Sequence, residues 1–351
     1  MNSTNSNSNA TPLFDLLMSQ YHTCSLLIFG RLGLFDCIHE HQINGTCISA
    51  EELAAHAKWS TRAASAMLIS LVASGVLETE ISSASDTTHS FQHRYKLTPR
   101  ATNFLLVDKP GSLIPYFELF WDCSPQLLLE KADAAKKQDN FMLETGSGAP
   151  SDLFINAMQG QTSYAAMVLA SLLTTHLSDV SHFMDIAGGS GTLCLEICKA
   201  SSHLKGSVYE LANVSPITQK FINNAELCDR VNAVKGDMFN DDTFPEADCY
   251  GFGNVLHDWS DEDNMKLLQK ANKSLPHEKG KIIIVEMLVA EDIISTTNAT
   301  AGLNLVMVTN EDGRQYKASE LKPMLENSGF TGMEVVSSPL TPYSAIIAYK
   351  N

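Results

Sequence analysis

The stretch Asp185-Ile186-Ala187-Gly188-Gly189-Ser190-Gly191 gives the clearest indication of the fold class. It follows an apolar, strand-like run and opens a segment with helical spacing. Glycines permit a tight turn and let a ligand approach the backbone closely. In open α/β sheets, the turn between the first strand and the next helix binds nucleotide-like ligands. The stretch therefore predicts a cofactor-binding α/β domain, but a glycine-rich turn alone does not identify the cofactor.

Strand-like runs alternate with helical stretches from this turn onward. The apolar runs lie at 183–186, 206–209, 231–234, 249–252 and 281–285, and helical stretches at 192–200, 216–227 and 262–275 separate them. This alternation predicts a parallel sheet with helices on both faces. Runs at 333–336 and 345–349 predict a terminal hairpin that closes the sheet. We therefore assign residues 179–351 to a Rossmann-like catalytic domain.

The first third of the chain is rich in helix signals. Apolar residues recur with helical spacing over 12–39 and again over 60–75. Between these segments Ser49, followed three residues later by Glu52, forms the capping box that starts a helix. Short strand-like runs at 76–78 and 94–97 complete a winged-helix-like arrangement, which we assign to residues 12–108.

A winged helix suggests a DNA-binding regulator, but the charge argues against this function. The helix that would enter a groove, 60–74, carries a single cation, Arg62, and the chain has a net charge of −16. Contacts to DNA phosphates need a concentrated positive field. We therefore favour a packing or dimerisation module and expect no nucleic-acid partner.

The remaining segments indicate a cytoplasmic protein. Residues 1–11 are rich in Asn, Ser and Thr, which is typical of a disordered tail. Residues 109–178 keep a helical pattern that we interpret as a linker and substrate lid. No apolar run approaches the length of a membrane span, so we expect no membrane partner. Eight cysteines without metal-type spacing are typical of reduced thiols in the cytosol.

Two acids beside the glycine turn favour S-adenosylmethionine (SAM) over NAD. Asp185 suits a ligand with an ammonium and a sulfonium group, and it would repel a pyrophosphate; its alternative role is to cap the helix. Glu210, followed by Leu211, ends the second strand, where a carboxylate accepts ribose hydroxyls. Because NAD enzymes also use an acid there, Glu210 does not indicate which of the two cofactors is bound. The glycines expected to line the cofactor are Gly188, Gly189 and Gly191.

The loop after the third strand contains a further cofactor motif, Gly236-Asp237-Met238-Phe239. Asp237 is suited to bind the adenine amino group, and Met238 and Phe239 are suited to sandwich the ring. Alone, these residues are also typical of a loop with buried apolar side chains. Their place after the third strand of the same sheet favours the cofactor role.

The segment after the fourth strand, 254–263, contains the predicted catalytic base. His257 lies just past the strand end, and a histidine titrates near neutrality, so it can take a hydroxyl proton. Glu286 closes the fifth strand and Asp258 follows the base; either carboxylate is able to support the ring. Asn254 is expected on the cofactor side. An isolated histidine is more often structural, but here the cofactor motifs favour catalysis.

These motifs resemble the small-molecule O-methyltransferases of the caffeic-acid and hydroxyindole type. The resemblance covers nearly the whole chain and includes both cofactor loops, Gly33-Leu34-Phe35-Asp36, Tyr95-Lys96-Leu97-Thr98 and His257-Asp258-Trp259-Ser260-Asp261. It implies a homodimer with interlocking N-terminal helices, SAM as cofactor, no metal, and His257 as general base.

The chain departs from this family pattern at three positions. Ala187 replaces a glycine of the loop, and Gly253 stands where plant members have a cofactor-contacting lysine. In 311–316 the family commonly has a second acid beside the histidine, and that position is Gln315. A neutral amide positions an imidazole but does not stabilise its cation by charge. We therefore expect Glu286 and Asp258 to support the base, or a reaction other than ordinary proton abstraction.

Three functional hypotheses follow. We favour methyl transfer from SAM to a hydroxyl of a small aromatic or polyketide-like acceptor. A SAM-dependent pericyclic or oxidative reaction without methyl transfer is the alternative that Gln315 supports, and a winged-helix regulator is favoured least. Aromatic and methionine side chains suit a flat, apolar acceptor. The candidate pocket walls are Phe117, Phe120, Trp121, Phe154, Met158, Asn304 and Met307.

Overall fold

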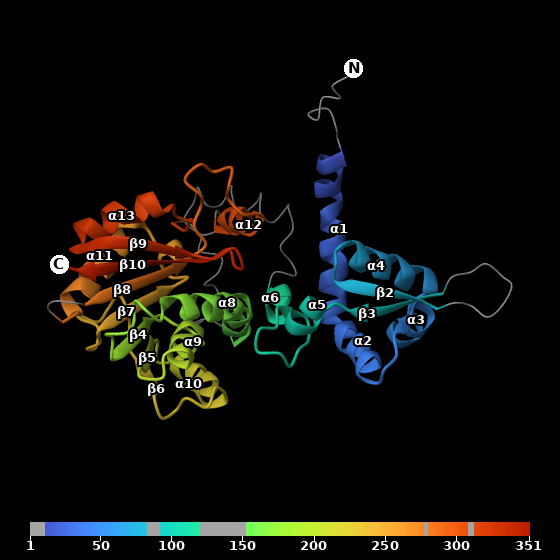
Figure 1. The fold of residues 1–351 in the computed structure, drawn as a ribbon, viewed down its shortest axis with the longest axis horizontal. Coiled ribbons are helices and arrows are strands. Elements are labelled where there is room, and N and C mark those ends of the chain that lie inside the picture. The colour runs from blue at the N-terminus through green and yellow to red at the C-terminus, as the bar shows by residue number, and fades with distance from the viewer. Residues whose placement is uncertain (1–10, 83–91, 120–151, 277–279, 308–311) are drawn as a thin grey trace, which may run out of the picture. The chain divides into compact units, whose positions relative to one another are not determined.

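The computed structural model describes residues 11–82, 92–119, 152–276, 280–307 and 312–351 (Figure 1). The chain divides into two compact units, Met1–Trp121 and Asp122–Asn351. Except for Thr11, the predicted tail lies outside the described residues, and so do the candidate pocket residues Phe120 and Trp121. None of the described helices is both long and apolar enough to cross a membrane.

The N-terminal unit combines helices with a small antiparallel sheet of order β1-β3-β2. The helical spacing predicted over 12–39 belongs to two helices, because Gly33 adopts a φ of 65° and divides the segment. The capping box of Ser49 and Glu52 is confirmed. The described elements are α1 (Thr11–Arg31), α2 (Leu34–Ile43), β1 (Ile48–Ser49), α3 (Ala50–Ala57), α4 (Thr61–Ala73), β2 (Leu77–Ser82), β3 (Gln92–Leu97), α5 (Pro99–Phe104) and α6 (Ile114–Leu119).

Within the described residues, the C-terminal unit contains a sheet of order β6-β5-β4-β7-β8-β10-β9. Strands β4 to β8 pair in parallel, and β10 is antiparallel to both β8 and β9. The predicted parallel sheet and terminal hairpin are confirmed. The strands are β4 (His182–Ile186), β5 (Lys205–Glu210), β6 (Val231–Lys235), β7 (Cys249–Gly253), β8 (Lys281–Glu286), β9 (Phe330–Ser337) and β10 (Ser344–Lys350); the helices are α8 (Asp152–Leu173), α9 (Thr192–Ala200), α10 (Ser215–Asn224), η3 (Leu256–Asp258), α11 (Asp261–Ser274), α12 (Asn298–Met307) and α13 (Ala318–Asn327).

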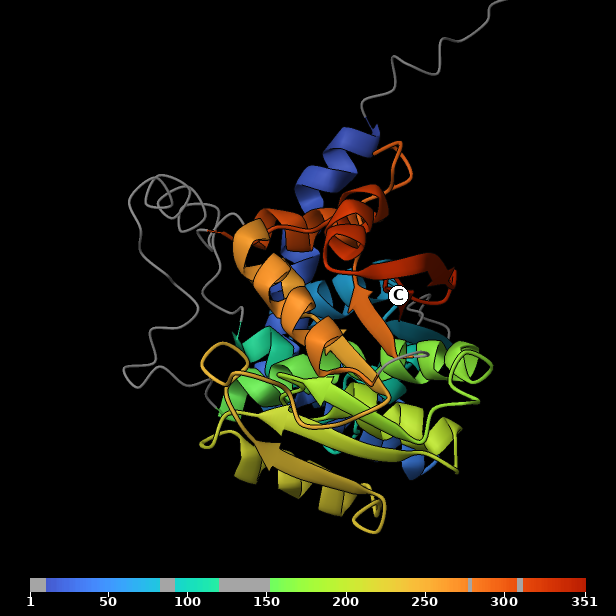
Figure 2. The same cartoon turned by 90° about the vertical axis from the view of Figure 1, so that its left-hand side faces the viewer.

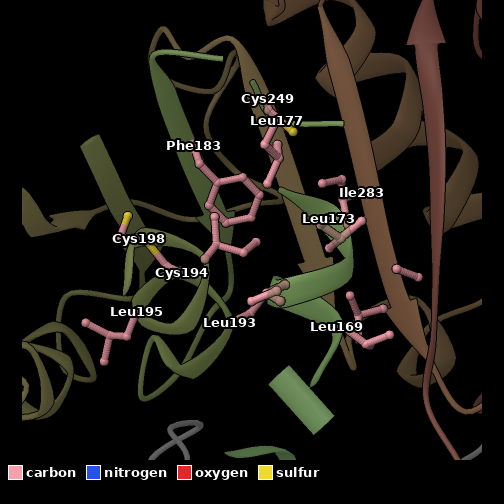
Figure 3. Packing of buried hydrophobic residues seen from close by; sticks show 14 of the residues in the cluster. Leu169, Leu173, Leu177, Phe183, Leu193, Cys194, Leu195, Cys198, Cys249 and Ile283 are labelled. Atoms are coloured by element: carbon pink, nitrogen blue, oxygen red, sulfur yellow. The ribbon is translucent and has the colours of Figure 1, made fainter. Parts of the chain in front are cut away.

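Helices cover both faces of this sheet (Figure 2). Ile283 and Val285 of β8 belong to a core cluster with residues of α8, α9 and α10. The alternate residues Ile282 and Ile284 belong to a second cluster with residues of α11 and α13, as the two-residue period of a strand requires. Figure 3 shows the first cluster, in which Phe183 of β4 lies among side chains of the covering helices. Strand β8 therefore reads as a continuous apolar run because both of its faces are buried.

The carboxyl ends of the parallel strands meet at one edge of the sheet. Asp185 lies at the end of β4, Glu210 ends β5 and Glu286 ends β8. His257 lies in η3, shortly after β7. Because β4 pairs in parallel with β5 and β7, and β7 with β8, these four residues lie along the same edge. This edge is the candidate site.

Candidate active site

The turn after β4 is packed tightly against Asp185. Gly191 has a φ of 77°, a left-handed backbone that favours glycine. At Gly188 a Cβ would lie 2.7 Å from Cγ of Asp185 and 2.8 Å from Cγ1 of Val208, so this position has no room for a side chain. Ala187 also has a positive φ, 53°, which costs a residue with a side chain about 1 kcal/mol. The turn therefore has no room for a side chain at Gly188 and holds Ala187 in a strained backbone conformation.

Asp185 is a buried acid with one unsatisfied oxygen. The residue is 1% exposed, and Oδ2 accepts a hydrogen bond from the Cys194 backbone N at 3.3 Å. None of the described residues donates to Oδ1. Burial raises the pKa of Asp185 to about 7 against the opposing effect of the Cys194 hydrogen bond, and Glu210 adds to the rise. One oxygen thus orders the start of α9, and the other suits a cationic group such as an ammonium.

Glu210 is held at the end of β5 by two backbone groups. Its Oε2 accepts from the N of Gly189 at 2.9 Å, and its Oε1 accepts from the N of Leu211 at 2.8 Å. Burial raises the pKa of Glu210, although both hydrogen bonds act in the opposite direction. A carboxylate oxygen accepts more than one hydrogen bond. The fixed carboxylate therefore has capacity for two neighbouring hydroxyls, as on a ribose.

The loop after β6 uses Asp237 for its own structure. Oδ1 of Asp237 accepts from the backbone N of Phe239 at 2.9 Å, and Oδ2 accepts from Nδ2 of Asn240 at 2.9 Å. The Asn240 side chain is the main cause of the lowered pKa of Asp237. Phe239 is 37% exposed and meets Trp259 edge-on, with ring centroids 4.6 Å apart, whereas Met238 packs against the core. The adenine contacts of these three residues stay predictions.

His257 is held at one ring nitrogen. Its Nδ1 lies 2.8 Å from Oε2 of Glu286 and 3.1 Å from Nε2 of Gln315. The Glu286 contact is an ion pair whose angle departs from that of a hydrogen bond, and Oε1 of the same carboxylate accepts from the His257 backbone N at 3.3 Å. The other nitrogen, Nε2, lies 3.6 Å from Oδ1 of Asp258. Nδ1 is therefore the more closely held end of the ring, and Nε2 has only the longer contact with Asp258.

The acids around His257 favour its charged form. Burial lowers the pKa of the ring, but the charges of Glu286 and Asp258 together outweigh burial and raise the pKa to about 9. The side chain of Glu286 is 1% exposed and that of Asp258 is 40% exposed. Solvent screens the exposed acid more strongly. Glu286 is therefore the main electrostatic partner, and the ring is more basic than an ordinary histidine.

A hydrogen-bond network that the sequence does not indicate surrounds Asn254. Its Nδ2 donates to the Tyr343 hydroxyl at 3.2 Å, and Gln161 of α8 donates to the same hydroxyl at 3.0 Å. Asn254 has a positive φ of 53°, and Tyr343 is 2% exposed. These residues come from distant parts of the sequence, so no local spacing connects them. The network fixes the chain three residues before His257.

The other predicted pocket residues are divided between the units. Phe117 of α6 packs against the core of the N-terminal unit. In the C-terminal unit, Phe154 and Met158 lie on α8, and Asn304 and Met307 lie on α12. Asn304 has a structural contact, because its Oδ1 accepts from the backbone N of Gln315 at 3.0 Å. Contact of these residues with an acceptor stays a prediction.

The sheet and the histidine–glutamate pair at its carboxyl edge define an α/β enzyme of the Rossmann-like class. The model of the O-methyltransferase domain matches residues 139–331, more than half of the chain, and the model of the O-methyltransferase dimerisation domain matches residues 15–106. The chain therefore belongs to the O-methyltransferase family. The predicted family and fold class are confirmed.

Individual relatives agree with this assignment. A tetracenomycin polyketide synthesis 8-O-methyl transferase from Streptomyces glaucescens is 25% identical over 94% of both chains. A probable scoulerine-9-O-methyltransferase from Papaver somniferum is 30% identical over 56% of this chain, which thus spans about half (53%) of that relative's length. The structure of human N-acetylserotonin methyltransferase in complex with SAM has a TM-score of 0.80 at 23% identity, with 100% of this chain and 99% of that chain covered. The last comparison shows a shared fold.

Proposed function

We propose that this protein transfers the methyl group of SAM to a hydroxyl of a small, flat acceptor, with His257 as the general base. The observation that carries the proposal is the His257–Glu286 pair on the sheet edge that also bears Asp185 and Glu210. The pair is suited to accept a proton, and the two other acids are suited to hold the cofactor. Membership of the family supports transfer to oxygen.

The residues at the edge fit SAM. The unsatisfied oxygen of Asp185 would accept from the ammonium group, and Glu210 would accept from the ribose hydroxyls. Phe239 and Met238 would lie against the adenine ring, and the turn at Gly188 lets the backbone approach the ligand. When bound, SAM supplies an electrophilic methyl group on a sulfonium.

His257 performs the proton transfer in this proposal. Nε2 would take the hydroxyl proton as the acceptor oxygen bonds to the methyl carbon and the bond from that carbon to sulfur breaks, with S-adenosylhomocysteine as the leaving group. Glu286 then stabilises the imidazolium from the Nδ1 side. Because the pKa of His257 is raised to about 9, only a minor fraction of the cofactor-free protein has an unprotonated ring at pH 7.

The comparisons and the composition support the remaining parts of the proposal. Polyketide and scoulerine methyltransferases among the relatives support an aromatic or polyketide-like acceptor. The match to the dimerisation domain supports a homodimer formed through the N-terminal unit. The described cysteines are free thiols, which suits a reducing cytoplasm.

A transfer assay tests the proposal. SAM with a radiolabelled methyl group is incubated with phenols, flavonoids and aromatic polyketides, using the wild type, His257→Ala and the surface control His203→Ala. We expect label transfer by the wild type and the control, and a loss of about 100-fold or more in His257→Ala, the usual contribution of a general base. Undiminished transfer by His257→Ala would exclude the base.

Gln315 favours one further candidate function. A neutral amide beside the base supports a SAM-dependent pericyclic or oxidative reaction in which the methyl group stays on sulfur. SAM that binds, is not consumed, and accelerates conversion of an added polyketide would support this candidate over methyl transfer.

A further inference from the structure

The side-chain amide of Gln315 makes its described polar contact with the ring of His257. Its amide nitrogen lies 3.1 Å from Nδ1 of His257, on the opposite side of the ring from Asp258. The residue is 4% exposed, and none of the described residues hydrogen-bonds to Oε1. His257 is therefore the one polar partner of this side chain in the described part of the protein.

The chain around Gln315 is tied to the segment that carries the base. The backbone N of Arg314 donates to the carbonyl of His257 at 2.8 Å. The guanidinium of Arg314 and the hydroxyl of Tyr316 both donate to the carboxylate of Asp261, at 3.2 Å and 2.8 Å. Because both of its neighbours are anchored to the segment that carries His257, Gln315 is held beside the ring.

Glu286 decides which ring nitrogen carries the proton. A carboxylate 2.8 Å from Nδ1 favours an N–H there, because its negative charge attracts the positive end of the N–H bond. That N–H would face the amide nitrogen of Gln315, donor against donor. The two ends of an amide have the same shape, and hydrogen bonding assigns them. With the ends exchanged, the amide oxygen gains the donor that it otherwise lacks.

We propose that Gln315 is a positioning residue for the base: its amide oxygen accepts a hydrogen bond from the Nδ1–H beside the charge of Glu286, which leaves the lone pair on Nε2 and limits the negative charge at Nδ1 to one carboxylate. The inference rests on the proposed function and deepens it. It names the nitrogen that takes the proton and the reason that this nitrogen stays available.

The neutral amide of Gln315 matters because two carboxylates already lie near the ring of His257. Glu286 approaches from β8 and Asp258 from the ring's own turn. The segment after α12 contributes the neutral Gln315. The charged guanidinium of Arg314, its neighbour in the same segment, is paired with Asp261 and Glu320 instead. A second carboxylate at this place would bind the imidazolium more strongly. It would thereby reduce the fraction of ring that is free to accept a proton at neutral pH.

Nitrogen NMR of the ring tests the proposal without any acceptor. Protein labelled with ¹⁵N-histidine is titrated with pH as the wild type, Gln315→Glu and Gln315→Met, and His257→Ala assigns the signal. In the wild type we expect the neutral ring to carry its proton on Nδ1. In Gln315→Glu the midpoint should rise by about one pH unit or more, the effect of an added opposite charge at this distance. Gln315→Met, of similar size but without an acceptor, should populate both tautomers with little change in midpoint.

Either of two results would overturn the proposal: a neutral wild-type ring with its proton on Nε2, or an unchanged midpoint in Gln315→Glu. If Gln315→Glu does not fold, the tautomers of the wild type and of Gln315→Met still test the proposal. A merely structural glutamine would alter the melting temperature of these variants and leave the tautomer and midpoint unmoved. Because the measurement involves no methyl transfer, a failed transfer assay does not affect it.

Discussion

Asp185 links the proposed cofactor contact with stability through a single side chain. It is 1% exposed, and burial raises its pKa to about 7 from an ordinary value of 3.8. The folded state therefore binds this proton more tightly than the unfolded state does. The resulting stability is fully present below about pH 4 and is lost as the pH rises toward 7. At higher pH the ionised carboxylate costs on the order of 4 kcal/mol, from about 1.4 kcal/mol per pH unit.

Asp185→Asn should stabilise the cofactor-free protein more at pH 8 than at pH 5, by about 2.7 kcal/mol, from the two pH units between 5 and the raised pKa. The amide keeps an acceptor for Cys194 and has no charge to bury. Melting temperatures by calorimetry at the two pH values measure the difference, and SAM affinity should fall at least about tenfold with the lost charge.

Asp237→Asn is the matched control, because the pKa of Asp237 is lowered by the hydrogen bonds that it accepts. Its stabilising contribution is present above the ordinary pKa of Asp, so this variant should melt earlier at pH 8. An equal gain in stability for Asp185→Asn at both pH values would contradict the assigned cost of the buried charge.

The residues of the site differ in how far the sequence predicts them. Asp185, Glu210 and Glu286 are recognisable because each lies at the end of an apolar run, where parallel strands present side chains to one edge. Gln161 and Tyr343 are not recognisable, since they meet at Asn254 only through the fold. A hydrogen bond between distant residues leaves no periodic pattern in the chain.

Among the elements, the parallel strands were predictable and the break between α1 and α2 was not. Five predicted parallel strands agree with β4 to β8, because continuous β-branched and aromatic runs are typical of such strands. The division of α1 from α2 depends on the backbone of Gly33, whereas the apolar spacing continues across it. The two-residue β1 exists only through its pairing with β3.

The turn between β4 and α9 should tolerate a glycine at position 187 and reject a side chain at 188. In Gly188→Ala the new Cβ would meet Asp185 and Val208 at 2.7–2.8 Å, and both are buried on strands that cannot easily shift. We expect a loss of about 1–3 kcal/mol of stability, typical of overpacking, together with a loss of SAM affinity. Urea unfolding and calorimetric titration measure the two effects.

Ala187→Gly tests the same turn by removing a side chain instead of adding one. It relieves a left-handed alanine at φ 53°, and the greater chain entropy of glycine offsets most of that gain. Its stability should therefore stay within about 1 kcal/mol of the wild type, with SAM affinity retained. A turn that accepted alanine at both positions would show that space at Gly188 does not control it.

At the scale of the whole molecule, the sequence predicted a helical and winged-helix-like N-terminal part and an α/β C-terminal part, and both classes are confirmed. The compact units divide after Trp121, within a segment outside the described residues. The acceptor is harder to predict, because pocket walls are defined by packing between helices. Aromatic residues such as Phe117 have the same spacing whether they face a core or a ligand.

The N-terminal unit leaves apolar surface on its first helix uncovered. Leu16 of α1 is 70% exposed and Tyr21 is 61% exposed, whereas Ser25, one turn further on, is 7% exposed. Exposed apolar residues gathered on one long helix are typical of an interface. The proposed homodimer would cover them, so this surface is the candidate contact between the subunits.

Leu16→Asp combined with Tyr21→Asp should convert the dimer to a monomer at micromolar concentration, because a buried interface does not accept unpaired charges. Light scattering coupled to size exclusion measures the mass, with Leu340→Asp as a control at a residue that is equally exposed (64%) but lies between β9 and β10. We expect the dissociation constant of the double variant to rise by about 100-fold or more, equivalent to about 2.7 kcal/mol, and that of the control to stay unchanged. A wild type that is already monomeric, or a double variant that stays dimeric, would mean that the exposed face of α1 does not hold the subunits together.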